Sequence, residues 1–294
     1  MNIKELIIYG TQKIKEQEIE NANLQAKLLL SHLLNQTKEY LIINQEKEIE
    51  EKIENEFKEN IEKLIKGYPI QYIIKKQEFM KLNFYVDENV LIPQPDTEIL
   101  VEEVLNICKD LKNVKILDMC TGSGAIAISL SKYIKDSIVT ATDISEKALE
   151  VAEKNAKANE VEINFFKSDM FKELTNMNFD VIVSNPPYIE NNVILNLSEQ
   201  VKHEPYIALA GGEDGLDFYR ILAQNSYNHL NKNVYLCLEI GYNKKQSVIT
   251  LLKNTNKYED IHCIKDLANL DRVIIAKKKE WKNVFFIRNK RRIK

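Results

Sequence analysis

Short apolar runs alternate with longer amphipathic stretches from residue 114 to about residue 278, and this alternation limits the fold more than any other feature. Strands are expected at residues 114–119, 137–143, 163–169, 179–185 and 233–240. Helices are expected at about 124–135, 145–159, 219–230 and 244–256. Repeated strand–helix units form a parallel sheet with helices on both faces. The sequence therefore predicts an α/β fold with a doubly wound sheet, closed by antiparallel strands at 260–265 and 272–278.

The first part of the chain is helical in pattern. Apolar side chains recur three or four residues apart in three stretches, at 3–14, 22–33 and 49–65. Gly67 stands where a glycine commonly ends a helix, and a proline follows it two residues later. We expect a small helical domain over residues 1–68.

A different pattern separates this domain from the sheet. Residues 69–92 are rich in Ile, Tyr, Phe and Val with partial alternation, which predicts a hairpin linker. Two prolines then break the chain before an amphipathic helix, for which Asp96 or Thr97 is the expected N-cap. The main domain is accordingly expected over residues 93–276.

The composition excludes several classes of protein. The 294 residues carry 41 basic and 44 acidic side chains, a net charge of -3 that argues against a uniformly basic nucleic-acid binder. Hydrophobic residues make up 44% of the chain, too many for a disordered protein. No apolar run approaches the ~18 residues of a membrane span, and the first residues lack a secretory signal. The cysteines and histidines show no metal-ligand spacing, so we expect a cytoplasmic protein without a metal site.

Residues 277–294 form a basic C-terminal tail. They carry nine Lys or Arg residues against one Glu, whereas the rest of the chain is acidic. A solvated, poorly ordered terminus is the favoured interpretation. A contact with RNA or the ribosome is the alternative.

A glycine-containing loop follows the first predicted strand. Gly122 and Gly124 permit a tight turn, and the helix that begins there offers free N–H groups to an anionic ligand. Asp143 ends the second strand, where a carboxylate can accept hydrogen bonds from both ribose hydroxyls, although it could also cap the next helix. With Ala127, the glycines match the dinucleotide pattern G-x-G-x-x-A, yet the same layout suits S-adenosylmethionine. The glycine pattern alone leaves these two cofactors open.

The tetrapeptide Asn185-Pro186-Pro187-Tyr188 ends the fourth strand, on the same sheet edge as the glycine loop. Its prolines stop the strand and make a stiff, projecting loop.

Such a loop suits methylation of a planar nitrogen, which is a poor nucleophile because its lone pair is delocalised. The Asn185 side-chain oxygen and the Pro186 carbonyl can each accept one N–H of the target NH2, while Tyr188 packs against the flat group. No strong base is needed, because the proton can leave after the methyl arrives. This chemistry favours S-adenosylmethionine.

The chain resembles the peptide chain release factor glutamine-N5 methyltransferase (HemK/PrmC) family over roughly residues 5 to 276. NPPY is shared with many amino-methylases, and the combination with the other motifs is more specific. The matching stretches are PIQYI (69–73), LIPQPDTE (91–98), TGSGAIA (121–127), TATDIS (140–145), SDMF (168–171), NPPYI (185–189), HEPYIALAGGEDGLDFYR (203–220), LEIGY (238–242) and KDLANLDRV (265–273). The resemblance implies a Rossmann-like, S-adenosylmethionine-dependent methyltransferase sheet preceded by a helical substrate-recognition domain. It also implies methyl transfer to the glutamine of the Gly-Gly-Gln motif of release factors.

The resemblance assigns site residues as well. The cofactor would be contacted by Cys120, Thr121, Gly122, Ser123, Gly124, Asp143, Asp169, Met170 and Asn185. Asp169 would touch adenine, although a strand-end aspartate can equally be a helix cap. Residues 185–188 would hold the substrate glutamine, with Asn185, Pro186 and Tyr188 as catalytic residues. His203 and Glu204 are interpreted as loop structure.

Five residues depart from the family pattern. Gln94 occupies a usual arginine position, which removes a charge there. Glycine is common at the positions of Lys75, Lys81, Cys120 and Ala268, so turns at these places must accommodate a side chain.

Three alternatives to release-factor methylation follow from the same residues. A ribosomal-protein glutamine is the nearest, and an adenine or guanine amino group in nucleic acid is the second, which the basic tail slightly favours. The third is a non-catalytic cofactor-binding scaffold, against which the intact Asp143, Asn185 and Tyr188 argue. We expect release factors as protein partners and no membrane contact.

Overall fold

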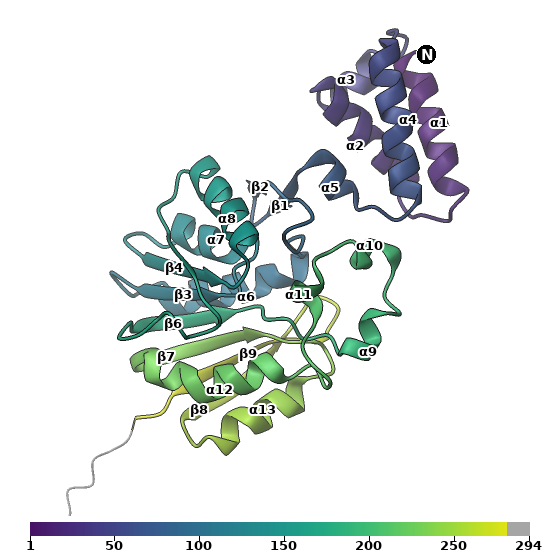
Figure 1. Ribbon diagram of the computed structural model, residues 1–294. Helices are drawn as coiled ribbons and strands as arrows, with labels where there is room; N and C mark the ends of the chain where they lie inside the picture. The colour runs from purple at the N-terminus through teal and green to yellow at the C-terminus, as the bar shows by residue number, and fades with distance from the viewer. Residues whose placement is uncertain (281–294) are drawn as a thin grey trace, which may run out of the picture.

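The computed structural model describes residues 1–280 and contains a central sheet of seven strands (Figure 1). The strand order is β5-β4-β3-β6-β7-β9-β8. The first five of these strands are parallel, and β9 and β8 are antiparallel to their neighbours. This confirms the predicted doubly wound sheet with its antiparallel closing strands. The bounds are β3 Lys115–Met119, β4 Ile138–Asp143, β5 Asn164–Lys167, β6 Phe179–Ser184, β7 Leu230–Glu239, β8 Tyr258–Lys265 and β9 Asp271–Lys278.

Helices cover both faces of the sheet (Figure 1). On one face lie α6 (Pro95–Cys108), α7 (Ala125–Tyr133) and α8 (Glu146–Ala158), and on the other lie α12 (Asp217–His229) and α13 (Lys245–Asn254). Successive residues of a strand point to opposite faces, so Ile116 joins one core and Leu117 the other. Both faces are therefore buried, and for this reason the central strands are rich in apolar residues.

The N-terminal helices form a separate core (Figure 1). They are α1 Ile3–Lys15, α2 Ala22–Leu34, α3 Lys38–Ile43 and α4 Glu51–Ile65. The helix α3 was not predicted, because six residues are too few to show a helical period. Gly67 ends α4 in the left-handed conformation, as expected, with φ of +87°.

The linker is more helical than expected. Pro69 opens a short helix, α5 (Ile70–Ile74), where the alternation pattern predicted strand, and Tyr72 is buried with its hydroxyl donating to the Val90 carbonyl at 2.6 Å. The hairpin itself is confirmed but shorter, with β1 (Gln77–Phe79) antiparallel to β2 (Leu82–Phe84). Lys75 and Lys81 both adopt positive φ, of +55° and +60°. These turns thus keep the conformation that glycine favours despite carrying side chains.

The start of α6 differs from the expectation. Gln94 is the N-cap residue and Pro95 the first helical residue, a position where the missing proline N–H is no loss. The expected N-caps Asp96 and Thr97 therefore lie inside the first turn, which leaves both side chains available for contacts beyond the helix.

The last strand was predicted over residues 272–278 and lies at Asp271–Lys278, so it overlaps the first two residues of the predicted tail. Lys277 and Lys278 pair with β7 and β8 as the end of β9. The expected basic tail otherwise lies largely outside the described residues, since 281–294 are not among them. Within residues 1–280, no helix is both long and apolar enough to cross a membrane.

Candidate active site

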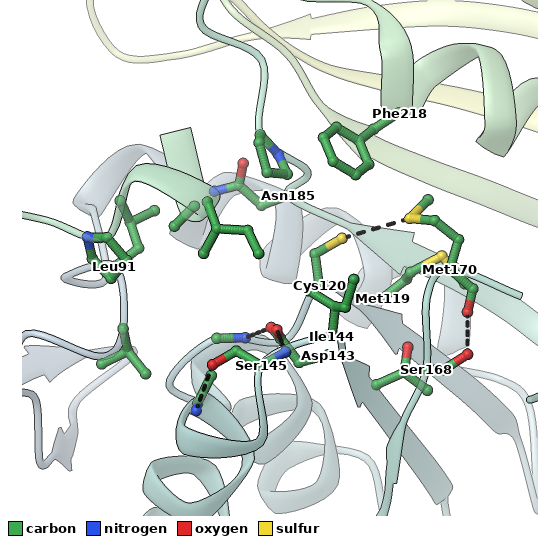
Figure 2. Close-up of a pocket in the computed structure, with 18 of the residues that line it drawn as sticks. Leu91, Met119, Cys120, Asp143, Ile144, Ser145, Ser168, Met170, Asn185 and Phe218 are labelled. Carbon is green, nitrogen blue, oxygen red and sulfur yellow. Dashed lines mark hydrogen bonds between the residues drawn. The ribbon is translucent and has the colours of Figure 1, made fainter. Parts of the chain in front are cut away.

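The candidate site lies where the strand order reverses. Strands β3 and β6 are neighbours at the centre of the sheet, and the chain continues to β4 on one side and to β7 on the other. A crevice opens beyond the carboxyl ends of parallel strands at such a point. Cys120 follows β3 and Asn185 follows β6, so the glycine loop and the NPPY loop meet at this crevice, as predicted (Figure 2).

A cavity of about 180 Å³ occupies the crevice. Figure 2 shows Asn185 and Phe218 at one side of this cavity and Asp143 with Ser145 across from them. Six of the predicted cofactor residues line it: Cys120, Gly122, Asp143, Asp169, Met170 and Asn185. Most of the remaining wall is apolar, which excludes water from much of the space.

The two loop glycines have different surroundings. Gly122 has φ of +54°, and a Cβ built there meets nothing within 4 Å, so its open side faces space that a ligand can fill. Gly124 has φ of +81°, but its Cβ would lie 2.9 Å from Ile128 and 3.1 Å from Ala152. Gly124 therefore allows α7 and α8 to approach each other and does not line the cavity.

Two further predicted cofactor residues lie behind the loop. The Thr121 hydroxyl donates to Asp118 Oδ2 at 2.6 Å, and the Ser123 carbonyl accepts from Asn155 Nδ2 at 2.9 Å. Neither residue lines the cavity. These bonds hold the loop against β3 and α8, so they shape the cavity from outside.

Asp143 anchors the opposite wall. Its Oδ2 accepts from the Gly122 N–H and its Oδ1 from the Ser145 N–H, both at 2.9 Å. Burial raises the pKa of this carboxyl, and the two backbone N–H groups oppose the shift. The cap of α8 is Ser145, whose hydroxyl accepts from the Ala148 N–H, so Asp143 is not the helix cap.

The side chain of Cys120 fits where the family usually has glycine. Cys120 has φ of +62°, the region that glycine favours, and its Sγ lies 4.0 Å from Met170 Sδ (Figure 2). Burial raises the pKa of the thiol, so it stays protonated at neutral pH. The loop thus keeps the glycine-like turn, and the sulfur forms part of the cavity wall.

Asp118 bonds to the glycine loop and to the first turn of α7, a role that the sequence did not reveal. It is fully buried; Oδ2 accepts from Thr121 and from the Ala127 N–H, whereas Oδ1 has no partner within the described chain. Burial raises its pKa to about 7. The signal in the sequence that could have pointed to this role was a carboxylate among the apolar residues of β3.

The NPPY loop presents one amide to the cavity. Asn185 and Pro187 line it, and Asn185 Nδ2 donates to the Thr97 hydroxyl at 3.3 Å. Pro186 and Tyr188 do not line it. Tyr188 packs toward Gly241, and burial raises the pKa of its hydroxyl while the nearby Arg272 opposes the shift.

A glycine-rich segment supports this loop from behind. Ile189 forms a parallel bridge with Ala210, and the Gly211 N–H donates to the Ile189 carbonyl at 2.8 Å. A Cβ at Gly211 would lie 2.7 Å from Tyr188 Cα, and one at Gly215 would lie 2.3 Å from the Tyr188 carbonyl oxygen. The GGEDG motif therefore makes room for the NPPY backbone.

Gly215→Ala and Gly122→Ala form a matched pair, since both glycines have positive φ. The Gly215 change drives a methyl group into the Tyr188 backbone, and we expect a loss of about 1–3 kcal/mol in the free energy of unfolding together with reduced turnover. The Gly122 change adds a methyl group that faces the open cavity, so we expect weaker cofactor binding with less loss of stability. Urea unfolding and calorimetric titration measure the two effects. Equal stability losses with unchanged cofactor affinity would contradict this assignment.

Glu204 bonds the loop over the cavity to the linker. Its Oε2 accepts from the Ile92 N–H at 3.0 Å, and the neighbouring His203 ring packs on Tyr68 with 5.1 Å between centroids. Burial raises the pKa of Glu204 to about 7, although the Ile92 N–H opposes the shift. Pro205, which follows directly, lines the cavity. The pair thus holds this loop against the linker.

The raised pKa of Glu204 predicts a specific pH dependence of stability. Between pH 4.5 and 7 the folded form keeps a proton on Glu204 that the unfolded chain releases. The contribution of Glu204 to the free energy of unfolding is therefore complete below pH 4.5 and declines as the pH rises towards 7. In Glu204→Gln, the free energy of unfolding should fall less steeply with pH than in the wild type, by up to about 1.4 kcal/mol per pH unit. Urea unfolding of both proteins from pH 5 to 8 measures it, and Glu56→Gln, at an exposed position on α4, controls for the substitution. Parallel curves for wild type and Glu204→Gln would refute the assignment.

Comparison with solved structures supports the fold. A methyltransferase from Pyrococcus furiosus superposes with a TM-score of 0.51 at 21% identity, covering 71% of this chain and 94% of that one. The 16S rRNA N2 G1207 methyltransferase of T. thermophilus, in complex with AdoMet and guanosine, gives 0.51 at 17% identity, over 69% of this chain and 50% of that one. At these identities the likeness concerns the fold alone.

Sequence comparison identifies the family as well as the fold. A PrmC N-terminal domain matches residues 5–74, and a methyltransferase small domain matches residues 94–206. The release factor glutamine methyltransferase of Clostridium acetobutylicum is 40% identical over 94% of this chain and 98% of its own length. That of Bacillus cereus is 37% identical, over 94% and 99%. With its cavity between a glycine loop and an NPPY loop, the chain belongs to the release factor glutamine methyltransferase family.

Proposed function

We propose that this protein transfers a methyl group from S-adenosylmethionine to the side-chain amide nitrogen of the glutamine in the Gly-Gly-Gln motif of peptide chain release factors. One observation carries the proposal: the same cavity is lined by the Gly122–Asp143 wall and by the Asn185 amide. A donor site and an acceptor site in one crevice are what a direct transfer requires. The relatives are named release factor glutamine methyltransferases, which supports a release factor glutamine as the acceptor.

The cavity residues fit S-adenosylmethionine. Gly122 leaves open space beside its Cα, where the amino-acid end of the cofactor would lie. Asp143 is half-buried and lines the cavity, so its carboxylate can accept from the ribose hydroxyls. Asp169 and Met170 would contact the adenine side. The bound cofactor supplies an electrophilic methyl group on a sulfonium.

The NPPY loop would hold the acceptor glutamine. Asn185 donates through Nδ2 to Thr97, which leaves Oδ1 free to accept an N–H of the substrate amide. The Pro186 carbonyl, although Pro186 does not itself line the cavity, is the proposed acceptor of the second N–H. Two such bonds orient the amide nitrogen toward the methyl donor, and orientation alone can contribute up to about 7–11 kcal/mol in favourable cases. A strong base is not required, because the proton can leave after transfer.

The surface around the site suits contact with a protein partner. Three large hydrophobic side chains there are at least half exposed, namely Tyr206, Ile207 and Tyr242. Ile207 also lines the cavity. The N-terminal helical domain would add a second contact for so large a substrate. A release factor acts where translation takes place, so we place the enzyme in the cytoplasm.

The direct test is incubation with labelled S-adenosylmethionine and separately purified release factors, ribosomal proteins and RNA. We expect label in a release factor, and peptide mass mapping should find one methyl group on the Gly-Gly-Gln glutamine. Label only in a ribosomal protein would point to the sister activity, and label only in RNA to a nucleic-acid amino-methylase. Either result would overturn the proposed substrate.

A further inference from the structure

Glu239 is a buried carboxyl beside the acceptor loop that the proposed reaction does not use. It is the last residue of β7, only 2% exposed, and its Oε2 has no hydrogen-bond partner among residues 1–280. Burying an acid without full pairing costs free energy, so a role should offset the cost. The Thr97 hydroxyl and the Asn185 amide lie close enough to this carboxyl for hydrogen bonding to lower its pKa.

The orientation of Asn185 matters for acceptor binding. A side-chain amide has a donor end and an acceptor end of nearly equal size, so its surroundings decide which end faces the cavity. The proposed reaction needs the oxygen there, to accept an N–H from the substrate. Asn185 Nδ2 instead points to the Thr97 hydroxyl at 3.3 Å, on the side of Glu239.

An ionised carboxyl can only accept hydrogen bonds. The Thr97 hydroxyl, which is 4% exposed and already accepts from Asn185, must therefore donate its proton to Glu239. If the Asn185 amide were reversed, its oxygen would face the carboxylate and lose both bonds. Glu239 thus disfavours the reversed amide electrostatically.

We infer that Glu239 is a positioning residue that acts with Thr97 to hold the Asn185 amide with its oxygen toward the cavity. The catalytic consequence rests on the proposed function, whereas the orientation itself does not. Asn185 is the residue that would touch the substrate, and Glu239 acts only through it. The inference also explains why residues far apart in sequence, in the PDTE, NPPY and LEIG motifs, meet at one place.

A nearby ion pair network keeps this carboxyl in a charged environment. Arg272, mostly buried, pairs with Asp96 and with Asp266, each at 2.9 Å, and its charge lowers the pKa of Glu239. Burial is the larger effect and raises that pKa to about 7. Experiments at pH 8.5 therefore keep Glu239 ionised.

The first test measures the orientation without any substrate. In asparagine-labelled protein, the side-chain NH2 signal of Asn185 is assigned by its loss in Asn185→Ala. We expect slow exchange of these protons with solvent in the wild type, because Nδ2 donates to Thr97 and lies beside the Glu239 carboxyl. Exchange should accelerate at least about fivefold in Glu239→Gln and Thr97→Val, and return toward the wild-type rate in Thr97→Ser. Unchanged exchange in both Glu239→Gln and Thr97→Val would overturn the inference.

The second test separates positioning from general structure. We expect kcat to fall roughly 10–100-fold in Glu239→Gln and Thr97→Val, with KM for the release factor and cofactor affinity changed less than about threefold. Thr97→Ser should recover most of kcat. Thr140→Val, a buried threonine in β4 away from the cavity, is the matched control and should keep it. A loss of stability with unchanged kcat would mean a purely structural role.

A double-mutant cycle completes the design. If Glu239 acts through Asn185, adding Glu239→Gln to Asn185→Ala should lower kcat no further. Additive losses would contradict the inference. Failure of the wild type to modify any release factor would instead reject the proposed function, and the amide exchange measurement would still decide whether Glu239 orients Asn185.

Discussion

Asn185→Ala is expected to lower kcat by about 10²–10³-fold, the size of effect seen when one preorganised hydrogen-bonding group is removed from an active site. The variant loses the oxygen that would accept an N–H from the acceptor amide, and the acceptor nitrogen is then free to rotate away from the donor. The affinity for S-adenosylmethionine should fall much less, because the Gly122–Asp143 wall is untouched. Single-turnover methylation and calorimetric titration measure the two quantities.

The control for this change is Asn228→Ala, at an exposed position on α12. It should leave turnover and cofactor affinity as they are. Full activity in Asn185→Ala would remove the acceptor role of the NPPY loop altogether. An equal loss of cofactor affinity and turnover would mean that Asn185 serves the cofactor and not the acceptor.

The sheet could be predicted because its information is local. Each central strand is buried on both faces and is therefore mostly apolar, so β3, β4 and β6 were found within about a residue of their bounds. Short elements carry too few residues to show a period, and α3 and α9 (Asn191–Ile194) were missed for that reason. At α5, Pro69 and the burial of Tyr72 outweighed the local strand-like composition.

The site was predictable to the extent that its residues sit at strand ends. The alternation places Gly122, Asp143 and Asn185 at one edge of the sheet, and the structure brings all three to the same cavity. The contacts that hold them are long-range and left no local pattern. Asn185 and Thr97 are 88 residues apart in the chain, yet they are hydrogen-bonded. Such pairs follow from strand order, which a single sequence does not specify.

The glycine loop illustrates the difference between a motif and a site. Five consecutive residues from Cys120 to Gly124 were predicted to contact the cofactor, but only Cys120 and Gly122 line the cavity. A tight turn directs its residues alternately to either side. Thr121 therefore bonds back to Asp118, and Gly124 packs between two helices. A motif marks the loop, whereas backbone geometry decides which of its residues reach a ligand.

Asp143→Ala is expected to weaken S-adenosylmethionine binding by about 1.5–3 kcal/mol, the range for a hydrogen bond to a charged group, or about 10–150-fold in Kd. The structure adds a second reason, since the Asp143 carboxyl also accepts from the Gly122 and Ser145 N–H groups and so holds the loop in place. Asp143→Asn separates the two effects. It keeps one oxygen for the loop but loses the charge and one acceptor, so its affinity should fall between those of wild type and Asp143→Ala.

Asp169→Ala is the matched comparison for Asp143→Ala, because Asp169 also lines the cavity but is exposed and paired with Lys172. An exposed, ion-paired carboxyl contributes less, so the expected loss of affinity is below about 1 kcal/mol. Calorimetric titration gives Kd for each variant, and thermal unfolding shows whether the loop change spreads to the fold. An unchanged Kd in Asp143→Ala would mean that the ribose lies elsewhere. A larger loss in Asp169→Ala than in Asp143→Ala would place the main polar contact of the cofactor on the β5 side of the cavity.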